Sequence, residues 1–146
     1  MATFTTYSDG TPVVRSGGSN AAGFPAVTVF ENTFDATRRP LDAADVVEVL
    51  SIPANTFVLA VFLDCITADG DNLVHIGDGD DVDGWVASGP LTDGTVTQGA
   101  GAYAVATTSL VGKFYSAADT IDAEVVSGDT VTVGKFRVVA VCVCMG

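Results

Sequence analysis

The residues best suited to chemistry in this 146-residue chain lie in one aspartate-rich segment, Asp78-Gly79-Asp80-Asp81-Val82-Asp83-Gly84-Trp85. Calcium prefers several carboxylate and carbonyl oxygens, and alternating aspartates with glycine can wrap such an ion. The spacing differs from an EF-hand loop, because glycine is not sixth after a leading aspartate and no glutamate closes the segment. We therefore interpret residues 78–83 as a tight acidic turn with Trp85 packed beneath it, and keep calcium binding as the alternative.

Three cysteines and one histidine are the other residues that could bind a metal or act as nucleophiles. Cys142 and Cys144 are two residues apart in a strand-like segment, so their thiols lie on the same face of the strand. A structural zinc site needs about four ligands, and only the fold could bring Cys65 and His75 close to these two cysteines. A triad of Cys65, His75 and an aspartate is disfavoured, because Cys65 lies among hydrophobic residues where a thiolate is unstable. The odd cysteine count also argues against a disulfide framework. We interpret the cysteines as core residues and His75 as a packed, hydrogen-bonded residue.

The glutamates give no specific sign of an active site. Glu31, Glu48 and Glu124 are distant in sequence, and nothing places any of them opposite a second carboxylate, as a glycosidase would require. No glycine-rich loop follows a strand and opens a helix, so nucleotide binding has no support. The sequence predicts no catalytic residues, no cofactor-binding residues and no metal site, and hence a protein that is not an enzyme.

The composition predicts a protein that packs against other protein chains. Hydrophobic residues make up 48% of the chain and charged residues only 16%, against about a quarter in a typical soluble domain. The apolar runs are shorter than the ~20 residues of a membrane-spanning helix, so we expect no membrane partner. Eighteen acidic residues against six basic ones give a net charge of −12, which argues against the positive surface that nucleic acid requires. We therefore expect buried contacts between subunits.

The first part of the chain differs from the rest. Residues 1–44 are rich in glycine, proline, serine and threonine, and only residues 26–30 have a strand pattern. We expect an extended N-terminal arm that lies on a neighbouring subunit. The first residues show no basic segment followed by an apolar one, so we expect no secretory signal. We therefore expect the chain to be made and kept in a reducing cytoplasm.

Residues 45–146 are predicted to form a single all-β domain, a jelly-roll-like β-sandwich. Helix signals are weak and confined to 39–44 and 116–119, and residues 88–101 have the composition of a mobile loop. Short β-rich segments separated by glycine and aspartate turns are typical of a sandwich or jelly roll. The segments are 45–52, 56–67, 73–76, 85–87, 103–108, 114–115, 120–126 and 130–144.

Two of these segments are apolar on both predicted faces. In 56–67, one face would hold Phe57, Leu59, Val61, Leu63 and Cys65, and the other Val58, Ala60 and Phe62. Near the C-terminus, residues 136–144 show the same double pattern. A strand with one face in water normally alternates apolar and polar residues, and a small sandwich has no second layer over its outer faces. We therefore expect a symmetric homo-oligomer.

Several short elements follow one another in a characteristic order from residue 45 to the C-terminus. They are Asp45-Val46-Val47-Glu48-Val49-Leu50, Ile52-Pro53-Ala54-Asn55-Thr56, Ile76-Gly77-Asp78-Gly79-Asp80, Asp83-Gly84-Trp85, Lys113-Phe114-Tyr115-Ser116-Ala117-Ala118-Asp119-Thr120-Ile121 and the valine-rich final strand. Their order and spacing resemble the capsid decoration (cement) proteins of tailed bacteriophages, over about two thirds of the chain. The resemblance implies a jelly-roll-like domain on the outer shell, usually a trimer at capsomer junctions, and it carries no active-site residues. Residues 1–44 have no counterpart in it.

The first functional hypothesis is a non-enzymatic phage virion structural protein that decorates and stabilises the outer capsid surface. It would act as a homotrimer that bridges subunits of the major capsid protein, assembled in the host cytoplasm. The alternative is a tail or head fibre module that binds host surface glycans, although residues 88–101 contain no aromatic side chain for such binding. A third hypothesis is a small β-barrel enzyme, which a transition metal bound near His75 and Cys65 would support.

Overall fold

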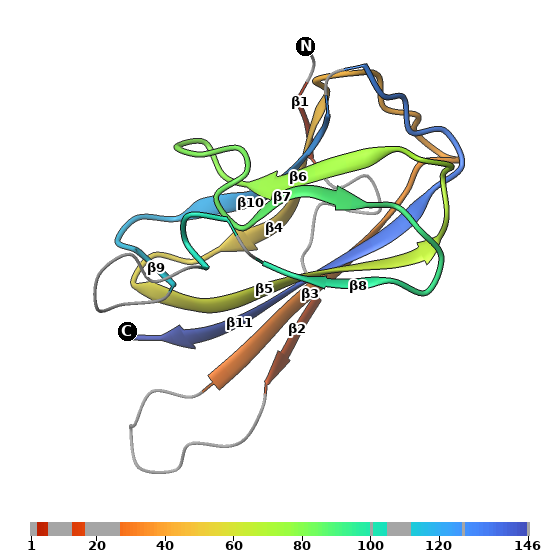
Figure 1. Ribbon diagram of the computed structural model, residues 1–146. Helices are drawn as coiled ribbons and strands as arrows, with labels where there is room; N and C mark the ends of the chain where they lie inside the picture. The colour runs from red at the N-terminus through yellow and green to blue at the C-terminus, as the bar shows by residue number, and fades with distance from the viewer. Residues whose placement is uncertain are drawn as a thin grey trace.

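The computed structural model describes residues 3–5, 13–16, 27–99, 101–104, 112–126 and 128–145, and these residues form strands and turns without a helix (Figure 1). No helix within these ranges could span a membrane. The strands are β1 (Thr3–Thr5), β2 (Val13–Ser16), β3 (Val27–Asp35), β4 (Val46–Ile52), β5 (Thr56–Thr67), β6 (Leu73–Gly77), β7 (Val86–Pro90), β8 (Val96–Gln98), β9 (Lys113–Tyr115), β10 (Asp119–Val125) and β11 (Lys135–Cys144).

The strands form two sheets that pack face to face (Figure 1). One sheet has the order β1-β4-β10-β6-β7, and the other has the order β2-β3-β11-β5-β8, with β9 also paired to β5. Neighbouring strands are antiparallel except for β1 and β4. The predicted all-β, jelly-roll-like sandwich is confirmed.

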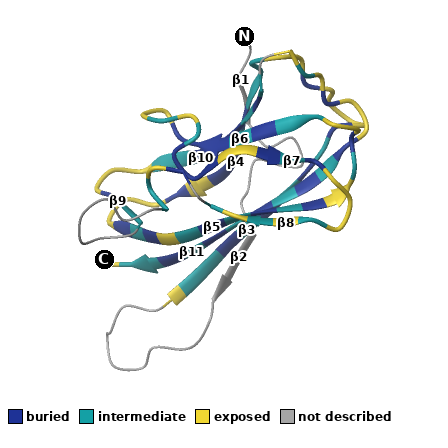
Figure 2. Ribbon diagram, in the orientation of Figure 1, coloured by how far each residue is buried: buried dark blue, intermediate teal, exposed yellow. Residues whose placement is uncertain are grey.

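The core lies between the inner faces of the two sheets (Figure 2). Strand alternation builds it: in β11, Phe136, Val138, Ala140 and Cys142 are buried while the residues between them point away. Trp85, Phe34 and Phe136 are the largest side chains that are fully enclosed.

A β-bulge changes which residues of β5 enter the core. Val141 pairs with Ala60 but Cys142 pairs with Val58, so Leu59 is an extra residue in the ladder. Val58 and Val61 are therefore both buried, whereas Leu59 is exposed and Phe57 only half-buried. The prediction that Phe57, Leu59 and Val61 share a face is wrong, because strict alternation cannot continue through a bulge.

Other predicted segments are shifted or shortened. β8 and the end of β7 lie within the predicted loop 88–101, the C-terminal strand begins at Lys135 instead of 130, and the weak helix signals at 39–44 and 116–119 give no helix. Of the predicted strand 103–108, residues 105–108 lie outside the described ranges.

The range 1–44 contains a central part of the sandwich. β3 lies within it and pairs with β11 from Val27 to Asp35, between β2 and β11. Residues 1–2, 6–12 and 17–26 lie outside the described residues. β1 and β2 also belong to the sandwich, where they pair with β4 and β3 at the edges of the two sheets. The arm therefore stays a prediction only for the residues before and between these strands.

At one end of the sandwich, Asp69 joins two of the connections that cross between the sheets. Asp69 lies in the β5–β6 connection, and its Oδ2 accepts backbone N–H groups of Thr132, Val133 and Gly134 in the β10–β11 connection, at 2.7, 2.7 and 2.6 Å. A Cβ on Gly134 would lie 2.9 Å from the Asp69 Cβ, so this approach requires glycine. Burial opposes ionisation of Asp69, but the three donors outweigh it and hold its pKa below the usual value.

We expect Asp69→Asn to lower the free energy of unfolding by about 2 kcal/mol, because hydrogen bonds to a charged group are lost. Urea unfolding followed by the fluorescence of Trp85, the single tryptophan, measures this value. Asp71→Asn is the matched control, since Asp71 lies exposed in the same turn. A depressed native pKa stabilises the fold above the unfolded-state pKa of about 3.9 and less as the pH falls through the native value, so the Asp69→Asn deficit should shrink in acid. If the two variants lost equal amounts of unfolding free energy, the stabilising effect of the Asp69 hydrogen bonds would be contradicted.

Candidate functional site

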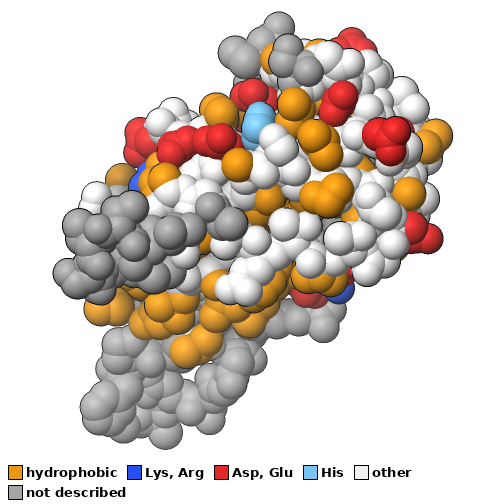
Figure 3. Space-filling model, viewed as in Figure 1, with side chains coloured by type: hydrophobic (Ala, Val, Ile, Leu, Met, Phe, Trp, Pro, Cys, Tyr) orange, Lys and Arg blue, Asp and Glu red, His pale blue; other side chains and the backbone are white. Residues whose placement is uncertain are grey.

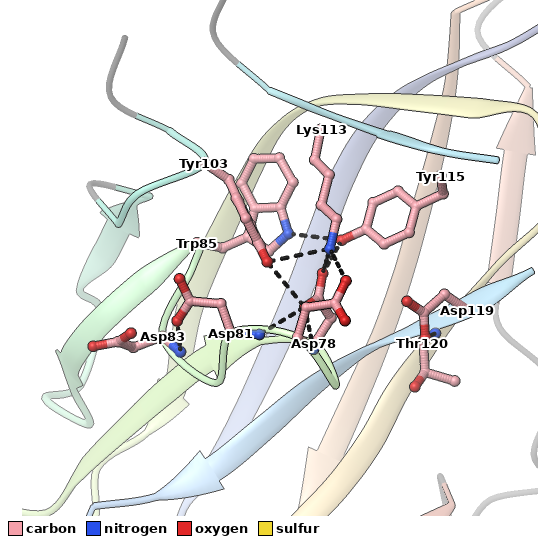
Figure 4. Close-up of polar contacts among 10 residues, drawn as sticks. Asp78, Asp81, Asp83, Trp85, Tyr103, Lys113, Tyr115, Asp119 and Thr120 are labelled. Atoms are coloured by element: carbon pink, nitrogen blue, oxygen red, sulfur yellow. Dashed lines mark hydrogen bonds and ion pairs between the residues drawn. The ribbon is translucent and has the colours of Figure 1, made fainter. Parts of the chain in front are cut away.

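The carboxylate of Asp78 is the most completely enclosed charge described in the molecule (Figure 4). Asp78 directly follows β6 and begins the predicted acidic turn, which closes with the Asp78 N–H donating to the Asp81 carbonyl at 2.9 Å. A Cβ on Gly77 would overlap the Asp81 carbonyl, so the turn needs glycine there. The side chain of Asp78 points inward, away from solvent, toward β9.

Donors surround both oxygens of this carboxylate. Lys113 Nζ lies 2.7 Å from Oδ2, and the Tyr115 hydroxyl donates to the same oxygen at 2.7 Å. Oδ1 accepts the backbone N–H groups of Asp80 and Asp81, at 3.0 and 3.1 Å, and the Tyr103 hydroxyl lies 3.2 Å away. This Asp78 cluster joins the acidic turn, residues 101–104 and β9.

The electrostatics of the cluster are those of a buried, satisfied ion pair. Burial opposes ionisation of Asp78, but the hydrogen bonds from Lys113 and Tyr115 hold its pKa below the usual value. Burial also disfavours charged Lys113, yet its hydrogen bond to Asp78 raises the lysine pKa. Burial raises the pKa of Tyr115, whose hydroxyl accepts a hydrogen bond from Trp85 Nε1 at 3.2 Å. Asp78 and Lys113 are thus both charged at neutral pH.

This geometry gives no support to calcium binding by residues 78–83. A cation needs open carboxylate oxygens, whereas those of Asp78 face donors. Within the described ranges, no group of three or more His, Cys, Asp or Glu side chains is placed to hold a metal. A surface pocket of about 190 Å³ lies beside Lys113, lined by Asp80 and residues 113–119. It is smaller than the roughly 300–1,000 Å³ of typical ligand pockets.

The fold separates the other candidate residues. Cys65 and Cys142 lie on the inner face of the six-stranded sheet, opposite Phe136 and Val58 respectively, so several residues of strand separate them. Burial raises the pKa of both thiols, to about 12 for Cys142. His75 lies in the other sheet, where its Nδ1 accepts the Ser88 N–H at 3.1 Å. No triad or zinc set forms from Cys65, Cys142, Cys144 and His75.

The outer face of the five-stranded sheet is acidic, which sequence reasoning missed. Glu48 of β4 pairs in register with Asp122 of β10, and Glu124 lies two residues further on, opposite His75. Glu31 lies on the other sheet, near Arg137. The alternation in the segment Asp122-Ala123-Glu124 was the available signal, but the Glu48 pairing depends on a bulge between Ile121 and Asp122. We call Glu48, Asp122 and Glu124 the acidic face.

Asp122 is the residue of the acidic face whose negative charge is least well stabilised. Burial raises its pKa, and the charge of Glu48 adds to this effect, giving a value of about 6. Its Oδ1 is buried without a hydrogen-bond partner. Ionised Asp122 therefore opposes folding at neutral pH.

The outer face of the six-stranded sheet is divided into a polar and an apolar end. At the polar end, Arg137 lies 2.6 Å from Asp64 and 3.9 Å from Glu31, and Lys135 lies 3.6 Å from Asp35. The apolar end consists of two cross-strand rows, and Figure 3 shows hydrophobic side chains gathered there, over β5 and β11. We call these rows the apolar outer face: Val29, Val141 and Ala60 in one row, and Val27, Val143, Phe57 and Phe114 in the other, with Leu59 at the bulge.

Three solved structures share the fold over nearly the whole chain. A chain from the capsid of Ralstonia phage GP4 has a TM-score of 0.57 at 13% identity, covering 90% of this chain and 92% of its own length. A chain of the cyanophage Pam1 capsid asymmetric unit has a TM-score of 0.60 at 15% identity, covering 90% and 94%. A chain of the acidic stable capsid structure of Helicobacter pylori bacteriophage KHP30 has a TM-score of 0.52 at 14% identity, covering 88% and 93%. No protein-family model and no curated protein matches the sequence.

We expect Lys113→Met to lower the free energy of unfolding by about 3 kcal/mol, because it leaves the buried Asp78 charge unpaired. Lys135→Met is the control: it removes a lysine from a more exposed pair at 3.6 Å and should cost less than about 1 kcal/mol. Adding Asp78→Asn to Lys113→Met should recover part of the loss. Urea unfolding measures all of these values, and additive losses in the double variant would contradict the pairing.

The stability gained by Asp122→Asn should grow with pH. The native pKa of about 6 lies above the unfolded value of 3.8, so the associated stability is present below pH 4 and is lost as the pH rises through 6. We expect little difference from the wild type at pH 3.5 and a gain of about 1 kcal/mol at pH 7.5, a figure reduced for partial exposure. Asp93→Asn, in an exposed turn, should show no such rise. A pH-independent difference in thermal unfolding would refute the assignment.

Proposed function

We propose that this chain is a non-enzymatic virion structural protein of a bacteriophage, which decorates and stabilises the outer capsid surface by bridging major capsid subunits. The observation that carries the proposal is the similarity of fold to chains of three phage capsid structures, over about nine tenths of both partners. The sequence resemblance from residue 45 onward supports the same function independently. The proposed location is the outside of the virion, with assembly in the host cytoplasm.

The polar clusters are consistent with a structural function. Asp69 and Asp78 are the buried carboxylates of the loops, and the donors around each belong to the same chain. Their hydrogen-bonding capacity holds the sandwich together and leaves no oxygen directed at a substrate. The net charge of −12 suits an exterior position, because like-charged surfaces resist unwanted association at high copy number.

The proposal is tested by counting and locating the protein in purified particles. Quantitative mass spectrometry should find copies in proportion to the major capsid protein, and cryo-electron microscopy should show them in icosahedral arrangement. A few copies at a single vertex would instead indicate the fibre module that binds host glycans. Absence from purified particles would refute both functions.

We expect particles that lack the protein to lose their DNA at a lower temperature than complete particles. The physical reason is that each bridge adds buried apolar surface, at about 25 cal/mol per Å² before the cost of association. Release of DNA, followed by a DNA-binding dye during heating, measures the difference. Re-addition of purified protein should restore the wild-type temperature, and bovine serum albumin should not. Identical release temperatures would contradict a stabilising function.

We further propose that the segments beside β1 and β2, residues 6–12 and 17–26, reach a neighbouring subunit, while β1 and β2 themselves belong to the two sheets. The variant that lacks residues 1–26 keeps β3 but loses the edge strands β1 and β2, and it should lose most of its occupancy on capsids in a pelleting assay. Deletion through residue 40 is unsuitable, because it removes β3 from the centre of the sheet. Trp85 fluorescence and far-UV circular dichroism check that the shortened chain folds. Unchanged occupancy with intact folding would refute the arm.

A further inference from the structure

The apolar outer face leaves much hydrocarbon surface in contact with water. Val27, Leu59 and Phe114 are 49%, 38% and 48% exposed, and the valines between them are only half-buried. The residues on a sheet face in contact with water are normally polar, as Arg137 and Lys135 are at the opposite end of the same face. Contiguous apolar patches of this kind mark interaction sites.

The charge distribution selects which partner this face can accept. The described side chains of the whole outer face hold two basic residues, Lys135 and Arg137, against three acidic ones, Glu31, Asp35 and Asp64. Among the described side chains the face therefore carries about one of the chain's twelve net negative charges, and its apolar end carries none. Arg15 of β2 pairs in register with Val29 at the margin of this end. Copies of an acidic chain repel one another through most orientations, but this face can meet its own copy without bringing like charges together.

The acidic face shows where a partner of opposite charge would be drawn instead. Glu48, Asp122 and Glu124 lie side by side there, with no lysine or arginine among the described residues of that face. A basic surface gains more from those carboxylates than from neutral valine and phenylalanine rows. The two outer faces thus favour different partners, and the neutral one favours identical copies.

We propose that copies of this chain associate through the apolar outer face, with the rows of Val141 and Val143 packed against the same rows of another copy. The inference deepens the proposed function, on which it rests for its biological setting, because it names the surface that holds the homo-oligomer together. Packed sheets lie about 10 Å apart with interdigitating side chains, which the small valine side chains permit. Phe57 and Phe114, paired in register, supply the aromatic contact of such an interface.

The test is the mass of the purified protein in solution. Sedimentation velocity should give twice the 14.8 kDa chain mass for the wild type, because a face that packs on the same face of another copy closes as a two-fold pair. A mass of three chains would contradict this packing. Val141→Glu and Phe114→Glu should each weaken association by about a hundredfold or more and shift the protein to the monomer mass. Val133→Glu is the matched control, because Val133 is 53% exposed and lies in the β10–β11 connection, away from this face.

The outcomes separate this inference from the proposed function. A monomeric wild type at about 100 μM, far above the dissociation constants of specific oligomers, would refute the inference. So would variants that keep the wild-type mass while Trp85 fluorescence shows them folded. If the wild type is monomeric but Val141→Glu abolishes capsid binding, the face docks on the shell, and the inference fails while the proposed function stands. If the protein is oligomeric but absent from virions, the inference stands and the proposed function fails.

Discussion

β11 hydrogen-bonds to β3 along one edge and to β5 along the other, so three strands that are distant in sequence form the middle of the six-stranded sheet. The register of these ladders fixes every other feature of that sheet. It buries Phe136, Val138 and Ala140 against the facing sheet, and it also aligns Val29, Val141 and Ala60 in a row on the opposite side. A slip of one residue would exchange the two sets. The bulge adds Leu59 and Phe57 to the set of residues that face away from the core.

The ends of the sandwich depend on two buried carboxylates, which accept hydrogen bonds from backbone N–H groups that have no strand partner. Where the chain leaves a strand, backbone N–H groups lose their ladder partners and must find others. Asp69 accepts three such groups in the β10–β11 connection, and Asp78 accepts two within its own turn. Asp78 also requires a partly buried lysine and two tyrosines, because its own side chain is fully enclosed. Asp78, which begins the segment that resembles a metal loop in sequence, is therefore an anion held by donors.

The sequence predicts the sandwich because β-branched segments and glycine–aspartate turns are local signals. It locates β4, β5, β6 and β10 closely, and it predicts that both faces of β5 and β11 are apolar. It cannot predict the bulges, since an extra residue at Leu59 or Val49 has no local signature and reveals itself only through the partner strand. For the same reason the pairing of Asp122 with Glu48 could not be predicted. The Asp78 cluster was missed because Tyr103, Lys113 and Tyr115 are 25 or more residues away in sequence.

The low charge content and the large net charge of this chain are explained together by the two outer faces. Only 16% of residues are charged, yet three quarters of these are acidic, and the basic ones described in strands are already paired across β3, β5, β9 and β11. Pairing Arg137 with Asp64 and Lys135 with Asp35 removes net charge from the six-stranded sheet, while the five-stranded sheet keeps Glu48, Asp122 and Glu124 unbalanced. Ionised Asp122 makes this arrangement costly for the isolated fold. Contacts of the kind proposed for the apolar outer face would offset such a cost.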